Sequence, residues 1–186
     1  MSLKDSVIKR NLLLSRESIF NWIYKGNENN IYELLNKISL DLINTALLNQ
    51  NNEIFATLDI AIVDLYKGNI EFIKSGACPT YIKNKKRVQM IKSTSLPTGI
   101  IEETTIQTFD KDIEAGDIML MCSDGILDSN IEYKNKELWI KYMLEDVETS
   151  NTQKIADLIL NEAIDNNYGV AKDDMSIIVI KVVNRN

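Results

Sequence analysis

The pattern of apolar residues divides this 186-residue chain into a helical first part and a strand-rich second part. Between residues 31 and 47, apolar residues recur at the three- and four-residue spacing of one helix face. A shorter helical pattern precedes it, from about Ser15 to Ile23. From Glu53 the period changes, and short apolar runs bounded by turn residues predict strands. The order of these elements favours an α+β fold with a mainly antiparallel sheet.

The predicted strands of the second part are separated by turn sequences. One hairpin turn is expected at residues 66–69 and another at residues 84–87. Two helices are expected later, one around Glu137–Met143 and one carrying Ile155–Ile164, capped by Ser150 or Asn151. The strands are predicted at residues 54–65, 70–75, 80–83, 88–91, 104–109, 117–122 and 175–183.

Composition removes several classes of function. Lys and Arg number 21 against 27 Asp and Glu, and the net charge of −6 without a basic run argues against nucleic acid and anionic membranes as partners. The chain has no histidine, which excludes Ser-His-Asp and Cys-His nucleophile systems and His-based zinc sites. Cys78 and Cys122 lack metal-binding spacing, so we expect two buried thiols in a reducing cytosol rather than a disulfide. No apolar stretch is long enough to span a bilayer.

Two acidic residues stand where apolar strands end or begin. Asp124 follows the run Asp117–Cys122, and Asp173 precedes the run Ile177–Ile180. A carboxylate held at the end of a buried strand is a suitable ligand for a hard cation such as Mg²⁺ or Mn²⁺. The alternative for each is a plain turn or a solvated strand entry, since Asp-Gly is a common turn pair.

Two other acidic residues have simpler explanations. Asp128 is expected to be a helix N-cap rather than an outer metal ligand. Asp59 lies inside an apolar strand, where a buried carboxylate needs a partner, and we expect a hydrogen-bonded structural acid rather than a site residue. Trp22 and Trp139 occur at helical spacing and are expected in the core.

A series of short stretches, in a fixed order, resembles a known family. The stretches are Glu53–Asp59, Gly76–Pro79, Leu96–Ile100, Ala115–Asp117, Met121–Ile126, Glu137–Trp139, Gln153–Leu158 and Asp173–Ser176. Through them the chain is similar to the C-terminal phosphatase domain of the bacterial stage II sporulation protein E family, a branch of the protein phosphatase 2C-like (PPM) metal-dependent serine/threonine phosphatases. Residues 137–139 and 153–158 indicate the sporulation branch, with a stress-response phosphatase of the same fold as a weaker alternative.

The resemblance implies a fold and a chemistry. The fold is an antiparallel β-sandwich flanked by helices, and the site holds two Mn²⁺ or Mg²⁺ ions that share a bridging water or hydroxide. Asp124 and Asp173 match the aspartates that hold the first metal, and they are the expected catalytic and metal-binding residues. In such a site a metal-activated hydroxide attacks phosphorus in line. The implied substrate is a phosphorylated anti-sigma factor antagonist in sporulation signalling. The implied location is the cytoplasm, with the chain as the soluble domain of a membrane-anchored protein.

The chain departs from the family at its N-terminal side. The family carries Asp-Gly-Met-Gly or Asp-Gly-His-Gly before its first long helix, whereas residues 4–14 contain no Asp-Gly. We therefore expect one truncated domain over residues 1–186, with a helical switch-like segment at 5–49 and a sheet-and-helix core at 53–183. Two carboxylates hold a hard cation weakly, so we expect this fragment to be inactive. Missing first strands would leave unpaired edges, from which we expect a homodimer. The alternative function is a catalytically silent phosphatase-like regulatory or dimerisation module.

Overall fold

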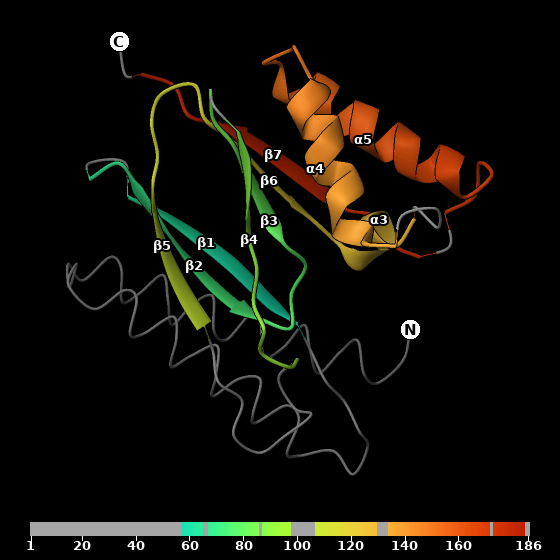
Figure 1. Ribbon diagram of the computed structural model, residues 1–186, viewed down its shortest axis with the longest axis horizontal. Coiled ribbons are helices and arrows are strands. Elements are labelled where there is room, and N and C mark those ends of the chain that lie inside the picture. The colour runs from blue at the N-terminus through green and yellow to red at the C-terminus, as the bar shows by residue number, and fades with distance from the viewer. Residues whose placement is uncertain are drawn as a thin grey trace, which may run out of the picture.

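A computed structural model describes residues 57–64, 67–85, 87–97, 107–129, 134–171 and 173–184 of the chain. The expectations for residues 5–49, including Trp22 and the switch-like segment, lie outside these ranges. The described strands form two antiparallel sheets (Figure 1). The first has the order β1 (Leu58–Asp64), β2 (Asn69–Ser75) and β5 (Gln107–Asp112). The second has the order β4 (Val88–Ile91), β3 (Thr80–Lys83), β6 (Ile118–Cys122) and β7 (Ile177–Lys181).

The strand pairings bring one set of strand ends to the same edge of the molecule. In the first sheet, the start of β1 pairs with the end of β2, with Leu58 opposite Ser75. In the second sheet, the end of β6 pairs with the start of β7, with Cys122 opposite Ile177. The residues that follow β6 and those that precede β7 must therefore be neighbours, although about fifty positions separate them in the sequence.

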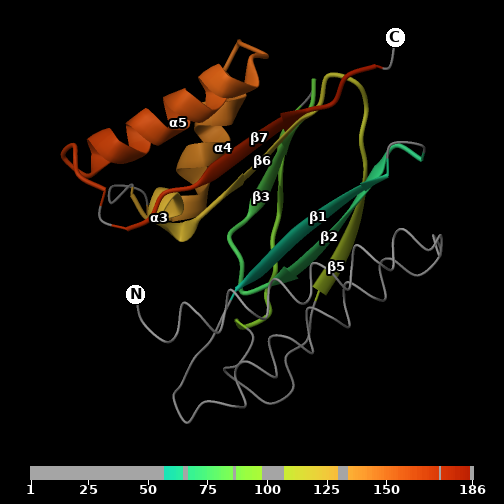
Figure 2. The ribbon, with the colours of Figure 1, turned by 180° about the vertical axis from the view of Figure 1, so that it is seen from behind.

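Within the described ranges, three helices accompany the second sheet. They are α3 (Asp124–Leu127), α4 (Lys136–Asp146) and α5 (Thr152–Asn166). Asparagine caps begin the two longer ones: the side chain of Asn135 accepts from Glu137 N, and that of Asn151 accepts from Lys154 N. Figures 1 and 2 show α4 and α5 covering the face of the second sheet that points away from the first sheet. The described part is thus a stack of sheet, sheet and helices.

Apolar side chains fill both spaces in this stack. Between the sheets, Ile70 and Phe72 of β2 pack with Ile82 of β3 and Met119 of β6. Alternate residues of β3 and β6 point the other way, as the two-residue period of a strand requires, and form a larger cluster with the helices. That larger cluster contains Tyr81, Leu120, Ile126, Trp139, Ile140, Leu144, Ile155, Ile159 and Ala163. The expectation that Trp139 is a core residue is confirmed, since it is 2% exposed.

The α+β fold with antiparallel sheets is confirmed, as are both hairpins, which join β1 to β2 and β3 to β4. Residues Asp124–Leu127 form a short helix, α3, that was not predicted, and one local prediction is wrong. Asp128 is the C-cap of that helix rather than an N-cap, because its N–H closes the turn on Asp124 O and Asn135 caps α4 instead. Within the described residues no helix has the length and apolar character needed to cross a membrane.

Candidate metal centre

The structure places the segments of Asp124 and Asp173 next to each other. Asp124 is the first residue of α3, directly after β6, and Asp173 lies four residues before β7. Both side chains are exposed. Figure 2 shows α3 beside the segment that leads into β7 at the same end of the molecule. The sequence placed each aspartate at a strand end, and the β6–β7 pairing brings those two ends together.

Ser123 ties the two acidic segments to each other. Its N–H donates to Ser176 O at 2.9 Å, and its Oγ donates to Asp174 O at 3.0 Å. The same Oγ accepts a 2.9 Å hydrogen bond from Ser176 N. One serine thus extends the β6–β7 ladder by a residue and fixes the backbone next to Asp173. In the sequence Ser123 stands out only as part of a motif, because its role depends on a partner strand that the sequence alone does not position.

Gly125 permits the close approach of these segments. A Cβ atom at this position would lie 2.5 Å from Asp174 O and 3.1 Å from Asp174 C. Gly125 is buried beneath the Asp173–Asp174 backbone, so a side chain there would have to push that backbone away. The glycine of the Asp-Gly pair therefore serves the packing of the site as well as the turn.

The two carboxylates are available to a cation. Asp124 Oδ1 accepts from Gly125 N at 3.0 Å, and Asp173 Oδ1 accepts from Asp174 N at 2.8 Å. Neither aspartate pairs with a lysine or arginine of the described residues. Asp128, in contrast, pairs with Lys136 at 3.1 Å. Two carboxylates suit a hard cation, but the described residues contain no cluster of three or more acidic, cysteine or histidine side chains to complete its shell.

Two thiols lie close to this acidic edge. Burial raises the pKa of Cys78 to about 11, and the charges of Asp124 and Asp59 contribute to that rise. Burial likewise raises the pKa of Cys122 to about 12, with Cys78 and Asp59 adding to the effect. Both cysteines are free, and both are partly rather than fully buried. Such thiols stay protonated at neutral pH and are poor ligands and nucleophiles there.

Asp59 has the structural partner that its place in an apolar strand predicted. Its carboxylate pairs with the ammonium of Lys74, its cross-strand neighbour on β2. Lys74 Nζ also donates to Thr80 Oγ1 at 2.9 Å. Burial raises the pKa of Asp59, and the hydrogen bond and charge of Lys74 oppose that rise. Asp59 is therefore engaged by a lysine inside the sandwich rather than presented to solvent with Asp124.

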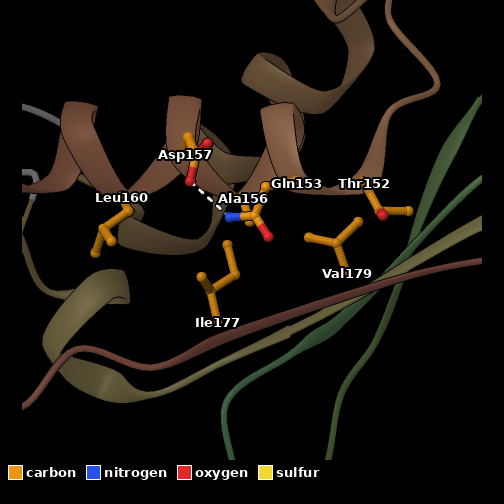
Figure 3. Close-up of a pocket in the computed structure, with 7 residues that line it drawn as sticks. All are labelled: Thr152, Gln153, Ala156, Asp157, Leu160, Ile177 and Val179. Carbon is orange, nitrogen blue, oxygen red and sulfur yellow. Dashed lines mark hydrogen bonds between the residues drawn. The ribbon is translucent and has the colours of Figure 1, made fainter.

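A separate cavity of about 190 Å³ lies between α5 and β7 (Figure 3). Leu160 of α5 and Ile177 and Val179 of β7 give it an apolar side. Its polar wall is formed by Gln153 and Asp157, which are joined by a 2.8 Å hydrogen bond. It contains one carboxylate, and neither Asp124 nor Asp173 lines it, so it is not part of the candidate metal centre.

Comparison with known proteins identifies the family. The sequence profile described as "Stage II sporulation protein E (SpoIIE)" matches residues 27–183. The chain belongs to the stage II sporulation protein E family. Stage II sporulation protein E of Priestia megaterium is 38% identical over 146 residues, which cover 78% of this chain and 25% of that protein. The protein of the same name from Bacillus subtilis (strain 168) is 35% identical over 147 residues, 78% of this chain and 18% of its own length. The chain thus spans a quarter or less of these curated relatives.

Solved structures show which part of the relatives the chain matches. The phosphatase domain of the cell fate determinant SpoIIE from B. subtilis, in a crystal form without domain swapping, is 32% identical with a TM-score of 0.70. The match covers 93% of this chain and 75% of that one. A manganese-presoaked form of that domain is 32% identical with a TM-score of 0.65, over 81% of this chain and 68% of its own. The predicted phosphatase 2C-like fold and serine/threonine phosphatase family are confirmed.

Proposed function

We propose that this SpoIIE-family chain carries part of a metal-dependent serine phosphatase site, in which Asp124 and Asp173 hold the same hard cation. The observation that carries the proposal is the Ser123 bridge, which fixes the backbone of both acidic segments at one strand edge. The manganese-presoaked crystal of a relative supports a metal of this kind. Mn²⁺ and Mg²⁺ both suit carboxylate oxygens, and either ion is compatible with the proposal.

The roles of the chain's own residues follow from their geometry. Asp124 and Asp173 would supply the oxygen ligands, and their exposed side chains leave the site open to a phosphorylated side chain on another protein. A bound cation would lower the pKa of its water and neutralise charge on the phosphoryl oxygens. Ser123 and Gly125 would hold the two ligands at a constant separation without touching the cation. No protein nucleophile is needed, which suits a chain that lacks histidine.

Catalysis by this chain alone is proposed to be very weak. The described residues offer two carboxylates, and residues 4–14 lack the Asp-Gly motif that the family resemblance calls for. Two ligands hold one cation loosely and do not assemble a two-metal site. The second candidate function, a catalytically silent phosphatase-like regulatory or dimerisation module, follows from the same observation.

Manganese binding and turnover together test these proposals. Mn²⁺ titration of this chain should show weak binding that Asp124→Asn and Asp173→Asn both abolish. Asp112→Asn is a matched control, because Asp112 is an exposed aspartate at the end of β5 that pairs with the start of β2, away from the acidic edge. Hydrolysis of p-nitrophenyl phosphate should stay near background in all four proteins. An active wild type would refute the proposed inactivity, and a wild type that does not bind Mn²⁺ would refute the metal site.

The proposed substrate is a phosphorylated anti-sigma factor antagonist, handled in the cytoplasm during sporulation. Similarity to stage II sporulation protein E over residues 27–183 supports this branch of the family. The acidic net charge agrees with a protein substrate rather than a nucleic acid. Because turnover by this chain is proposed to be near background, binding of such a phosphoprotein, measured beside an unrelated phosphoserine protein, tests the choice. Equal affinity for both proteins, or no binding to either, would count against it.

A homodimer is proposed from the free edge of the second sheet. Within the described residues β7 pairs only with β6, and its side chains Ile178 and Ile180 are 58% and 41% exposed. An exposed apolar edge strand is a ready site for pairing with another chain. A monomer mass in light scattering across micromolar concentrations would contradict the dimer.

A further inference from the structure

A lysine ammonium is buried between the two sheets at the same end of the molecule as the acidic edge. The side chain of Lys74 is fully buried. It pairs with Asp59 of β1 and donates a 2.9 Å hydrogen bond to Thr80 Oγ1, at the start of β3. A charge taken out of water is tolerated only with close partners of this kind. These three residues, the Asp59–Lys74–Thr80 link, therefore connect the first sheet to the second.

The Asp59–Lys74–Thr80 link joins the two ends of the chain segment that crosses from the first sheet to the second. Residues 76–79, the crossover, carry the chain from β2 in the first sheet to β3 in the second, and they lie between Lys74 near the end of β2 and Thr80 at the start of β3. The crossover is also braced from outside, because Gly76 N donates to Ser95 O at 3.2 Å. Gly76 has φ +59°, and Pro97 occupies the space where a Cβ would stand, at 2.6 Å. The crossover is thus held at both ends and along its outer side.

The crossover leads to the candidate metal residues by two routes. Cys78, in its middle, lies close enough to Asp124 for that charge to act on its thiol. Thr80 begins β3, which pairs with β6 through Tyr81 and Leu120. β6 ends at Cys122, two residues before Asp124. A shift in the start of β3 would therefore move the strand end from which Asp124 projects.

We infer that Lys74 is a positioning residue for the candidate metal centre: by tying Asp59 to Thr80 it fixes the crossover and the end of β6. The inference depends on the proposed function only in the assumption that Asp124 binds a cation. Lys74 is enclosed between the sheets, so it touches neither cation nor substrate and acts through Thr80 and β3. Loss of the Lys74 ammonium would remove the contact that holds the crossover residues in place, and it would leave the Asp59 carboxylate without its partner.

The two cysteines allow a test that needs no catalytic activity. Cys78 reports on the crossover and Cys122 on the end of β6, and alkylation of each can be followed by mass spectrometry. Lys74→Met should raise both rates about tenfold or more, at a temperature where unfolding curves show every variant folded. Thr80→Val removes the hydrogen bond between Lys74 and Thr80 without leaving a charge unpaired, so it should also raise both alkylation rates. It replaces Lys74→Met in the test if that variant does not fold.

Lys83→Met is the matched control. Lys83 is at the other end of β3, where its Nζ donates to Leu144 O at 2.6 Å and to Val147 O at 2.5 Å, at the C-terminus of α4. This substitution should lower stability and leave both alkylation rates unchanged. Unchanged rates in Thr80→Val, or an equal rise in Lys83→Met, would overturn the positioning role.

Manganese titration separates this inference from the proposed function. If the wild type binds Mn²⁺, Lys74→Met and Thr80→Val should weaken that binding about tenfold or more, because residues that support metal ligands affect metal affinity to this extent. Lys83→Met should leave Mn²⁺ binding unchanged. Unweakened binding in the first two variants would overturn the inference. If the wild type does not bind Mn²⁺, the metal proposal fails, and the alkylation rates alone decide the role of Lys74.

Discussion

Substitution of Gly125 by alanine is the most direct test of how the acidic edge is packed. The new Cβ would lie 2.5 Å from Asp174 O, about 0.9 Å inside the 3.4 Å of an ordinary contact. The obstacle is backbone that Ser123 holds in place, so the strain cannot be relieved by a side-chain rotation. Such overpacking costs about 1–3 kcal/mol. Because alanine favours the helical turn by about 0.5–1 kcal/mol, we expect a net loss of roughly 0–2.5 kcal/mol in unfolding free energy, centred near about 1 kcal/mol.

Urea unfolding and amide exchange would measure this effect. Gly125→Ala should speed exchange at the amides of Ser123 and Ser176, whose bonds join the two segments at 2.9 Å each. Gly116→Ala is the control: Gly116 has φ +102° and no atom within 4 Å of the point where a Cβ would stand, so it adds backbone strain of about 1–3 kcal/mol without a clash. It should lower stability and leave both amides protected. A Gly125→Ala protein with wild-type stability and unchanged exchange would refute the packing argument.

Three further predictions concern stability. Lys83→Met should cost about 1.5–3 kcal/mol in urea unfolding, because the carbonyls that end α4 lose a charged donor; a cost below roughly 0.5 kcal/mol would contradict this. Asp110→Lys should add roughly 0.5 kcal/mol to the unfolding free energy, because Asp110 faces Glu71 on the neighbouring strand. Burial, followed by the negative charge of Asp110, raises the pKa of Glu71. A thermal midpoint at or below that of the wild type would count against this prediction. Burial raises the pKa of Cys78 from 9.0 to about 11, so folding favours the neutral thiol. The contribution of this thiol to folding stability is complete below pH 9 and is lost as the pH rises to about 11. Cys78→Ala should therefore lose less stability than the wild type between these two pH values, and identical pH profiles of stability would refute the prediction.

Local pattern was enough to predict much of the fold. The strands at residues 80–83 and 88–91 have the predicted bounds, and Asn151 caps α5 as expected. These features depend on neighbouring residues: two-residue alternation, turn-forming sequences and a capping side chain act within a few positions. The short helix α3 was not predicted because four residues are too few to show a helical period.

The sequence predicted the residues of the candidate site but not the contacts that hold them together. The pattern placed Asp124 and Asp173 at strand ends and the family resemblance paired them, since a carboxylate beside an apolar run is visible along the chain. Tertiary structure decided what holds them together: the Ser123 bridge, the close approach at Gly125 and the buried Lys74 ammonium. Each of these contacts joins residues from different strands or from segments far apart in the chain. Their energies exist only once β6 pairs with β7 and the two sheets stack, so no local pattern could indicate them.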